Sequence, residues 1–281
     1  MKLKIFIQLI RIDQTLFTLP FAYLGLLFAG GDEIYTWIWV TIALVSASTL
    51  GLLLNQLIDL NKDAKNPRKN RILISNREVK KPSVWSLAIF LSLILIFSAY
   101  MINRLCFHLS FVAILGLVIF PFIKRINIVS HFYLGIIQAS SIIGGYLAVT
   151  SRFDIIPLLI LSIAIFMWMS GLDIIYSLKD VEFDKDKGPI PISARYGMGK
   201  ASMISSILYV FAMIALIIAG VLTSRGTAYW VSIISVAIIF YKQQFLIRNR
   251  DFEIAIVEFI QINHMIPAIL FIGTFIDVMI K

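Results

Sequence analysis

The chain has 281 residues, of which 59% are hydrophobic and only 15% are charged. An ordinary soluble domain is roughly 45–50% apolar, so this composition excludes a typical soluble protein and predicts an integral membrane protein. The net charge of +9 does not indicate a nucleic-acid partner, because the basic residues gather in alternate connections between apolar segments. The single cysteine, Cys106, excludes a disulfide framework and a cysteine metal site.

Nine apolar segments, each about long enough to cross a bilayer, follow one another along the chain. They lie at residues 12–30, 35–56, 83–102, 105–123, 131–150, 154–176, 201–222, 227–241 and 258–280. The sequence therefore predicts an all-α integral membrane protein, with nine transmembrane helices in a bundle that forms a single transmembrane domain over residues 1–281. No cleaved signal peptide is expected, because the first segment leads into eight more.

The basic residues predict the orientation of this bundle. Most of them stand in the N-terminal end and in the second, fourth, sixth and eighth connections, and the exceptions are Arg104, Arg152, Arg225 and Lys281. Basic residues favour the cytoplasmic side, so we expect a cytoplasmic N-terminus, an external C-terminus and long cytoplasmic connections. The expected location is the cytoplasmic membrane of a prokaryote.

The two long polar connections, at about 57–82 and 177–200, both begin with aspartates. They follow the second and the sixth segments, an offset of four helices that predicts two related four-helix halves and a ninth helix. An even offset preserves orientation, so both acidic connections should reach the same membrane face. Near the C-terminus, "YKQQFLIRNRDFEIAIVEFIQINH" mixes charges with apolar residues and is interpreted as an interfacial helix.

Each acidic connection begins with a stripe of carboxylates at helical spacing. In "NQLIDLNKD" the side chains at i, i+4 and i+8 are Asn55, Asp59 and Asp63, which share one helix face. In "DIIYSLKDVEFDKDKG" the offsets 0, 3, 7 and 11 again form one stripe, made of Asp173, Tyr176, Asp180 and Asp184. Carboxylates at the membrane edge are costly and tend to be functional, whereas tyrosine there is also a common interfacial anchor.

Two facing acidic stripes would repel each other unless cations lay between them. Hard oxygen ligands in this number suit Mg2+, which often keeps one or two carboxylates while substrate phosphates complete its shell. The residues thus predict a Mg2+-bound phosphate or diphosphate. Basic side chains on the same side are expected to bind the remaining phosphate charge, namely Arg68, Arg71, Lys124 and Arg125.

Other polar residues have simpler interpretations. Six lysines of the two long connections are interpreted as part of a solvated cytoplasmic face, namely Lys62, Lys65, Lys80, Lys81, Lys185 and Lys187. His108, His131 and His264 show no metal-ligand spacing and are interpreted as packing or interface residues.

The two motifs resemble those of a known family. "NQLIDLNKD" is similar to the NxxxDxxxD motif, and "DIIYSLKDVEFD" to the DxxYxxxDxxxD motif, of the UbiA superfamily of intramembrane aromatic prenyltransferases. Helix number, motif positions and the basic "FPFIKRINIVSH" connection fit the same family, so the resemblance covers nearly the whole chain. "DVEFDKDKGPIPISARYG" and "DQTLFTLPFAYLGLLFA" are most similar to 4-hydroxybenzoate polyprenyltransferase-like members. The chain departs from the pattern at Gln56, where an arginine is common, and in "RILISN", where RPLPSG is usual.

This resemblance implies Mg2+-dependent transfer of a polyprenyl group from an allylic polyprenyl diphosphate to an aromatic acceptor, such as 4-hydroxybenzoate or a related quinone precursor. It implies that the metal ions are held by Asp59, Asp63, Asp180 and Asp184, with Asn55 and Asp173 in or next to that shell. Tyr176 would orient the diphosphate or face the allyl cation. Arg11 or Arg71 would bind a benzoate carboxylate. The prenyl tail would lie among the helices or in membrane lipid, with the active site opening toward the cytoplasm.

Two alternatives stay open at this point. A glycerol phosphate alcohol could be the acceptor, as in archaeal-type ether-lipid synthesis, because "RKNRILIS" has the compact spacing of that branch. A cation-coupled transporter also uses intramembrane carboxylates, but there they lie near the bilayer midplane on broken helices. The acids here gather at one face beside long connections, which favours the enzyme. The sequence predicts no particular oligomeric state or prenyl length.

Overall fold

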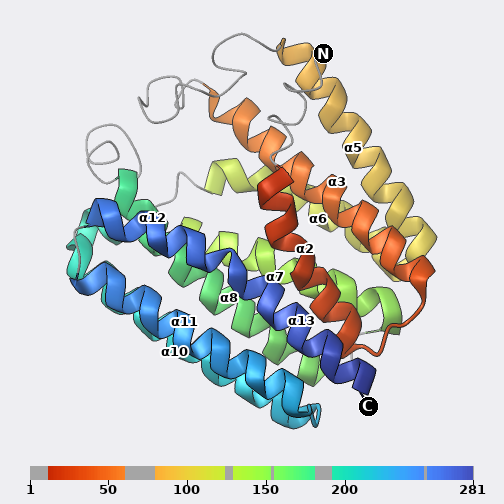
Figure 1. Ribbon diagram of the computed structural model, residues 1–281. Helices are drawn as coiled ribbons and strands as arrows, with labels where there is room; N and C mark the ends of the chain where they lie inside the picture. The colour runs from red at the N-terminus through yellow and green to blue at the C-terminus, as the bar shows by residue number, and fades with distance from the viewer. Residues whose placement is uncertain are drawn as a thin grey trace.

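The computed structural model describes residues 12–60, 80–123, 129–152, 155–180, 192–249 and 252–280, and within these ranges every regular element is a helix. Figure 1 shows the helices gathered in one bundle. In chain order they are α2 (Ile12–Phe28), α3 (Ile34–Ile58), α5 (Lys81–Ile102), α6 (Arg104–Ile123), α7 (Val129–Thr150), α8 (Ile155–Ser177), the 3-10 turn η2 (Leu178–Asp180), α10 (Ile192–Leu222), α11 (Thr227–Asn249), α12 (Phe252–Asn263) and α13 (Met265–Ile280).

Each of the nine apolar segments coincides with helix in the structure. Within the described part of the chain, eight helical stretches are long and apolar enough to cross a membrane, and α2 is a shorter apolar helix of 17 residues. The last of the eight stretches, Ile254–Ile280, spans both α12 and α13. These findings support a multi-pass membrane protein, while the orientation of the termini and the two-halves repeat stay predictions.

The stretch interpreted as an interfacial helix belongs instead to the bundle. Its first half is the end of α11 and its second half is α12, and the two helices pack against each other. The amide of Gln243, fully buried, donates to the Phe259 carbonyl at 3.1 Å. Lys242 pairs with Glu258 at 2.9 Å. Burial explains the difference, because Leu246, Ile256 and Phe259 belong to the hydrophobic core of the bundle, whereas the side chains of the Lys242–Glu258 pair are partly exposed.

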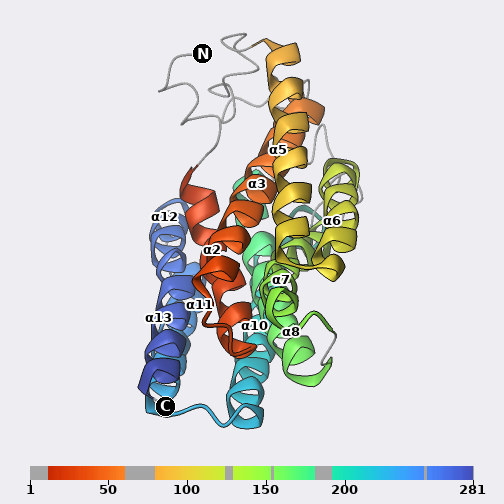
Figure 2. The same cartoon turned by 90° about the vertical axis from the view of Figure 1, so that its right-hand side faces the viewer.

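The helices that matter for function surround α7 and α8. α8 packs against α7 on one side and α10 on the other, α2 packs on α7, and α3 packs on α5. α2 lies in the middle of the bundle, between α3 and α13 (Figures 1 and 2). Figure 2 shows α12 and α13 nearly in line along one side of the bundle.

Glycines bring α7 unusually close to both of its neighbours. A Cβ on Gly145 would overlap the Ala22 carbonyl of α2, and a Cβ on Gly25 would overlap the Ile142 carbonyl of α7. A Cβ on Gly135 would likewise overlap Ser170 of α8. Small residues allow such close backbone approach between helices in membranes, where dispersion contacts provide much of the association energy. The position of α7 relative to α2 and α8 is therefore tightly fixed.

Two sets of polar side-chain contacts join helices at one end of the bundle. The Asn103 amide, between α5 and α6, donates to the carbonyls of Leu147 and Ala148 in α7, at 2.9 and 3.3 Å. The Arg225 guanidinium lies 4.1 Å from the Phe28 ring centroid, and Asp277 accepts a hydrogen bond from the backbone N–H of Gly226. Burial lowers the pKa of Arg225, and the nearby Asp277 carboxylate opposes that shift.

Candidate active site

A cavity of about 920 Å³ lies among α2, α3, α5, α6, α7 and α8. One end is polar and is lined by Asn55, Asp59, Asp173, Tyr176 and Lys179. The other end is apolar and is lined by residues that include Val40, Leu95, Ile102 and Cys106. Along α3, the 15 helical steps from Val40 to Asn55 correspond to a length of about 22 Å. The cavity is thus an elongated apolar space with an acidic mouth.

Two helices place carboxylates at the mouth near their C-termini. Asp59 caps the C-terminus of α3, donates its backbone N–H to the Asn55 carbonyl at 3.0 Å, and is 8% exposed. Asp173 and Tyr176 stand in the last turns of α8, whose C-terminus borders the same cavity. A helix C-terminus carries a partial negative charge, so a carboxylate there is unfavourable without a compensating cation. The mouth is therefore suited to bind a cation.

The structure brings four of the predicted site residues to this one cavity, namely Asn55, Asp59, Asp173 and Tyr176. The others lie outside the described residues: Asp63, Arg68, Arg71, Lys124, Arg125 and Asp184. Arg11 also lies outside them, and Asp180 is described in its backbone but not in its side chain. Within the described ranges, no group of three or more His, Cys, Asp or Glu side chains is arranged to hold a metal ion.

Sequence reasoning missed two polar residues of the mouth. His131, interpreted from the sequence as a packing residue, is 2% exposed, and its Nδ1 lies 2.6 Å from Oδ2 of Asp173. Lys179 places its Nζ 5.1 Å from the centroid of the Tyr176 ring. A histidine buried in an apolar bundle is costly without a partner, and that cost is the sequence signal that could have suggested its role. For Lys179, its place inside the second acidic motif is the corresponding signal.

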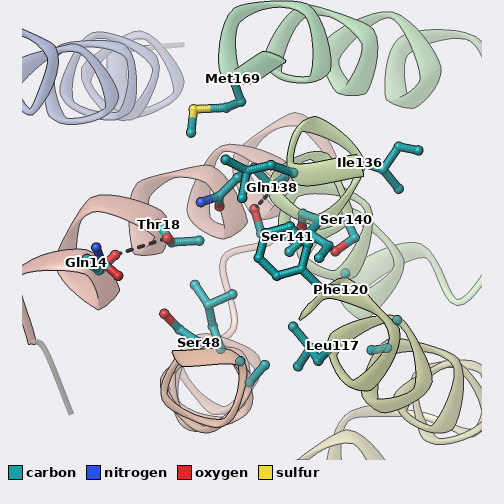
Figure 3. Close-up of a pocket in the computed structure, with 18 of the residues that line it drawn as sticks. Gln14, Thr18, Ser48, Leu117, Phe120, Ile136, Gln138, Ser140, Ser141 and Met169 are labelled. Atoms are coloured by element: carbon teal, nitrogen blue, oxygen red, sulfur yellow. Dashed lines mark hydrogen bonds between the residues drawn. The ribbon is translucent and has the colours of Figure 1, made fainter. Parts of the chain in front are cut away.

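Polar side chains also reach into the middle of the cavity, as Figure 3 shows for Gln14, Thr18, Ser48 and Gln138. They come from α2, α3 and α7. The Thr18 hydroxyl donates to the Gln14 carbonyl at 3.1 Å. The side-chain amide of Gln138, by contrast, makes no hydrogen bond to any described residue. An amide without a partner in apolar surroundings is unfavourable, so Gln138 is suited to bind a polar part of a ligand.

An apolar helical bundle around an elongated cavity with an acidic mouth is the arrangement expected of a multi-pass membrane protein that binds an amphipathic ligand. The description of one family fits this arrangement: the UbiA prenyltransferase family, whose family model matches residues 18–264. The chain belongs to that family, and it is a prenyltransferase. The resemblance to this family that the sequence suggested is thereby confirmed.

Similar proteins agree with this assignment over the full length of the chain. A protein of Aeromonas hydrophila subsp. hydrophila named 4-hydroxybenzoate octaprenyltransferase is 27% identical over 277 residues, which cover 97% of this chain and 96% of that protein. The apo structure of a UbiA homologue from Aeropyrum pernix K1 has a TM-score of 0.86 and 26% identity, and the match covers 95% of this chain and 98% of that one. A UbiA homologue from Archaeoglobus fulgidus bound to GPP and Mg2+ shares the fold, with a TM-score of 0.75, 15% identity, and coverage of 96% and 99%.

Proposed function

We propose that this prenyltransferase transfers a polyprenyl group from an allylic polyprenyl diphosphate to an aromatic acceptor, 4-hydroxybenzoate or a related quinone precursor, in a Mg2+-dependent reaction. The observation that carries the proposal is the elongated apolar cavity whose mouth holds Asp59 and Asp173 on different helices. The name of the Aeromonas relative supports the benzoate acceptor, and the GPP and Mg2+ bound to the Archaeoglobus homologue support the donor and the metal.

The oxygen donors at the mouth fit Mg2+. Asn55 and Asp59 line the cavity from α3, beside the negative end of that helix, and a hard divalent cation would offset the charge that gathers there. Asp63, Asp180 and Asp184 are proposed as the further ligands. When bound, Mg2+ stabilises the charge that develops on the departing diphosphate.

The side chains of the chain would bind the two parts of the donor separately. Lys179 lies at the mouth, beside Tyr176, and would bind the diphosphate together with Arg68, Arg71, Lys124 and Arg125. The apolar walls of the cavity would hold the prenyl tail and exclude water from the reactive allyl cation. The Tyr176 ring would present a face toward that cation, since aromatic faces attract positive charge.

The acceptor would lie between the mouth and the Gln138 amide. As the carbon–oxygen bond to diphosphate breaks, the electron pair leaves with the diphosphate, and the aromatic ring forms the new carbon–carbon bond. The proton that the ring then loses would go to the Asp173 carboxylate, which lines the cavity.

The experiment uses the full chain purified in detergent, with 4-hydroxybenzoate, geranylgeranyl diphosphate and Mg2+. Prenylated benzoate detected by mass spectrometry, and lost both with EDTA and in Asp59→Ala, is the expected result. Mg2+-dependent binding of the diphosphate without product would move the acceptor to a naphthoate or a glycerol phosphate alcohol. Absence of diphosphate binding would contradict the proposed site.

A further inference from the structure

The contact between His131 and Asp173 is built into the fold. His131 stands in the first turn of α7 and Asp173 in the last turns of α8. The close approach of the two helices at Gly135, one turn after His131, sets their spacing, because any side chain there would overlap Ser170. His131 Nδ1 and Asp173 Oδ2 are then 2.6 Å apart, the distance of a strong hydrogen bond.

The surroundings of the imidazole decide where its proton lies. The other ring nitrogen, Nε2, is buried and has no hydrogen-bond partner among the described residues. Nε2 is unsatisfied in either neutral tautomer, but a ring with its only proton on Nε2 would also turn the Nδ1 lone pair toward the Asp173 carboxylate oxygen and lose the hydrogen bond, at a cost of about 1–3 kcal/mol. A neutral ring with its proton on Nδ1 avoids this cost and donates that proton to Asp173. The positive end of the α7 dipole lies beside this carboxylate and partly offsets the negative end of the α8 dipole.

The same hydrogen bond determines which oxygen of Asp173 is available. Oδ2 is engaged by His131, whereas Oδ1 makes no hydrogen bond to a described residue. The Asp173 side chain is 30% exposed and lines the cavity, while the His131 side chain is only 3% exposed. The imidazole thus lies behind the carboxylate and does not itself present a free atom to a ligand.

We propose that His131 is a positioning residue, whose Nδ1–H holds Oδ2 of Asp173 so that Oδ1 faces the aromatic acceptor and receives the proton that the ring releases. The inference rests on the proposed aromatic prenyl transfer. It assigns to α7 a part in holding Asp173, which differs from the Mg2+ binding proposed for Asp59 at the same mouth.

The first test compares His131→Asn with His131→Leu. The amide nitrogen of asparagine can occupy the place of Nδ1 and donate to Asp173, whereas leucine cannot. We expect kcat to fall about tenfold to a hundredfold in His131→Leu, the usual effect of losing a group that orients a functional side chain, with little change in the KM for the donor. His131→Asn should recover most of kcat, and His108→Asn, on the exposed face of α6, serves as the control. Equal losses in both His131 variants, or full activity in His131→Leu, would overturn the proposal.

The second test needs no substrate. The chain has three histidines, so 15N-histidine NMR of the protein in detergent resolves few signals, and His131→Asn assigns the one that disappears. We expect a neutral ring protonated at Nδ1 in the wild type, and a shift of that signal in Asp173→Asn. A ring protonated at Nε2, or one that does not respond to Asp173→Asn, would refute the pair. The NMR signal can show the hydrogen bond between His131 and Asp173 while no aromatic compound is prenylated. The hydrogen bond is then confirmed, but the proposed aromatic acceptor and the role of His131 in proton transfer are both refuted.

Discussion

Asp59 lies at the C-terminus of α3, where the helix dipole disfavours a negative charge. It caps the C-terminus of α3, is largely buried, and shares the cavity mouth with Asp173 from a second helix C-terminus. A Mg2+ ion bound between this carboxylate and a diphosphate would offset part of that cost.

The first prediction concerns Asp59→Asn, which keeps the shape of the side chain and removes its charge. We expect kcat/KM to fall about a hundredfold or more, because the neutral amide would hold more weakly the Mg2+ that stabilises the departing diphosphate. Steady-state kinetics at several Mg2+ concentrations would measure the loss. Asp32→Asn, in the exposed connection between α2 and α3, provides the control with the same chemical change. Comparable activity in both variants would contradict the role of Asp59.

The second prediction concerns Gln138, whose amide lies in the cavity without a partner among the described residues. Gln138→Met keeps the length of the side chain but removes the hydrogen bond that the amide would make to the aromatic acceptor, worth about 1 kcal/mol. We expect the KM for the aromatic acceptor to rise about fivefold, while the KM for the diphosphate stays the same and serves as the internal control. An unchanged acceptor KM would place the acceptor elsewhere in the cavity.

Residue types and spacing predicted part of the site, and long-range packing decided the rest. Asn55 and Asp59 are four residues apart on one helix, and Asp173 and Tyr176 are three apart on another, so periodicity alone placed each pair on one face. The contact between His131 and Asp173 joins residues 42 positions apart. The sequence spacing does not predict this contact, because the distance between the two side chains depends on how closely α7 and α8 pack at Gly135.

At the scale of helices, α7 is the element on which the cavity depends. It contacts α2 through Gly145, contacts α8 through Gly135, and contributes the cavity residues His131 and Gln138. Hydropathy predicted the existence of this helix and its bounds within two residues. It could not predict which glycines face a neighbour, since Gly144 and Gly145 are adjacent and equally apolar.

The third prediction uses these two adjacent glycines as a matched pair. A Cβ on Gly145 would overlap the backbone of Ala22, whereas a Cβ on Gly144 has no atom within 4 Å. We expect Gly145→Ala to lose about 1–3 kcal/mol of stability, the typical cost of overpacking, and Gly144→Ala to lose none. Thermal unfolding of both variants in the same detergent would measure the difference. Equal melting temperatures would show that α2 and α7 adjust freely.

At the scale of the whole molecule, apolar periods and segment lengths predicted the helices well. The described helices match all nine apolar segments, although α11 runs to Asn249, eight residues beyond its predicted end. Its polar residues after Phe240 suggested a surface position, but the buried amide of Gln243 has partners in α12, which hydropathy does not detect. The orientation in the membrane still rests on the basic connections.

The fourth prediction tests that orientation with single cysteines. Cys106 is the only cysteine and is buried, so Cys106→Ser gives a simple background for labelling. We expect Lys80→Cys to react with a membrane-impermeant maleimide only from the cytoplasmic side, and Asp32→Cys only from the outside. Both positions are exposed and lie at the ends of helices. The reverse pattern would invert the predicted topology.

The hydrogen bonds of Asn103 have a consequence for turnover. They tie the turn between α5 and α6 to the end of α7, beside Ile102 and Cys106 at the apolar end of the cavity. These contacts would keep that turn from opening to a substrate tail in the cavity, and a product would then withdraw its tail by the mouth or sideways between helices. Each added isoprene unit buries more apolar surface against the walls. Product release should then become slower as the tail lengthens. For long tails, product release rather than bond formation would be the rate-limiting step.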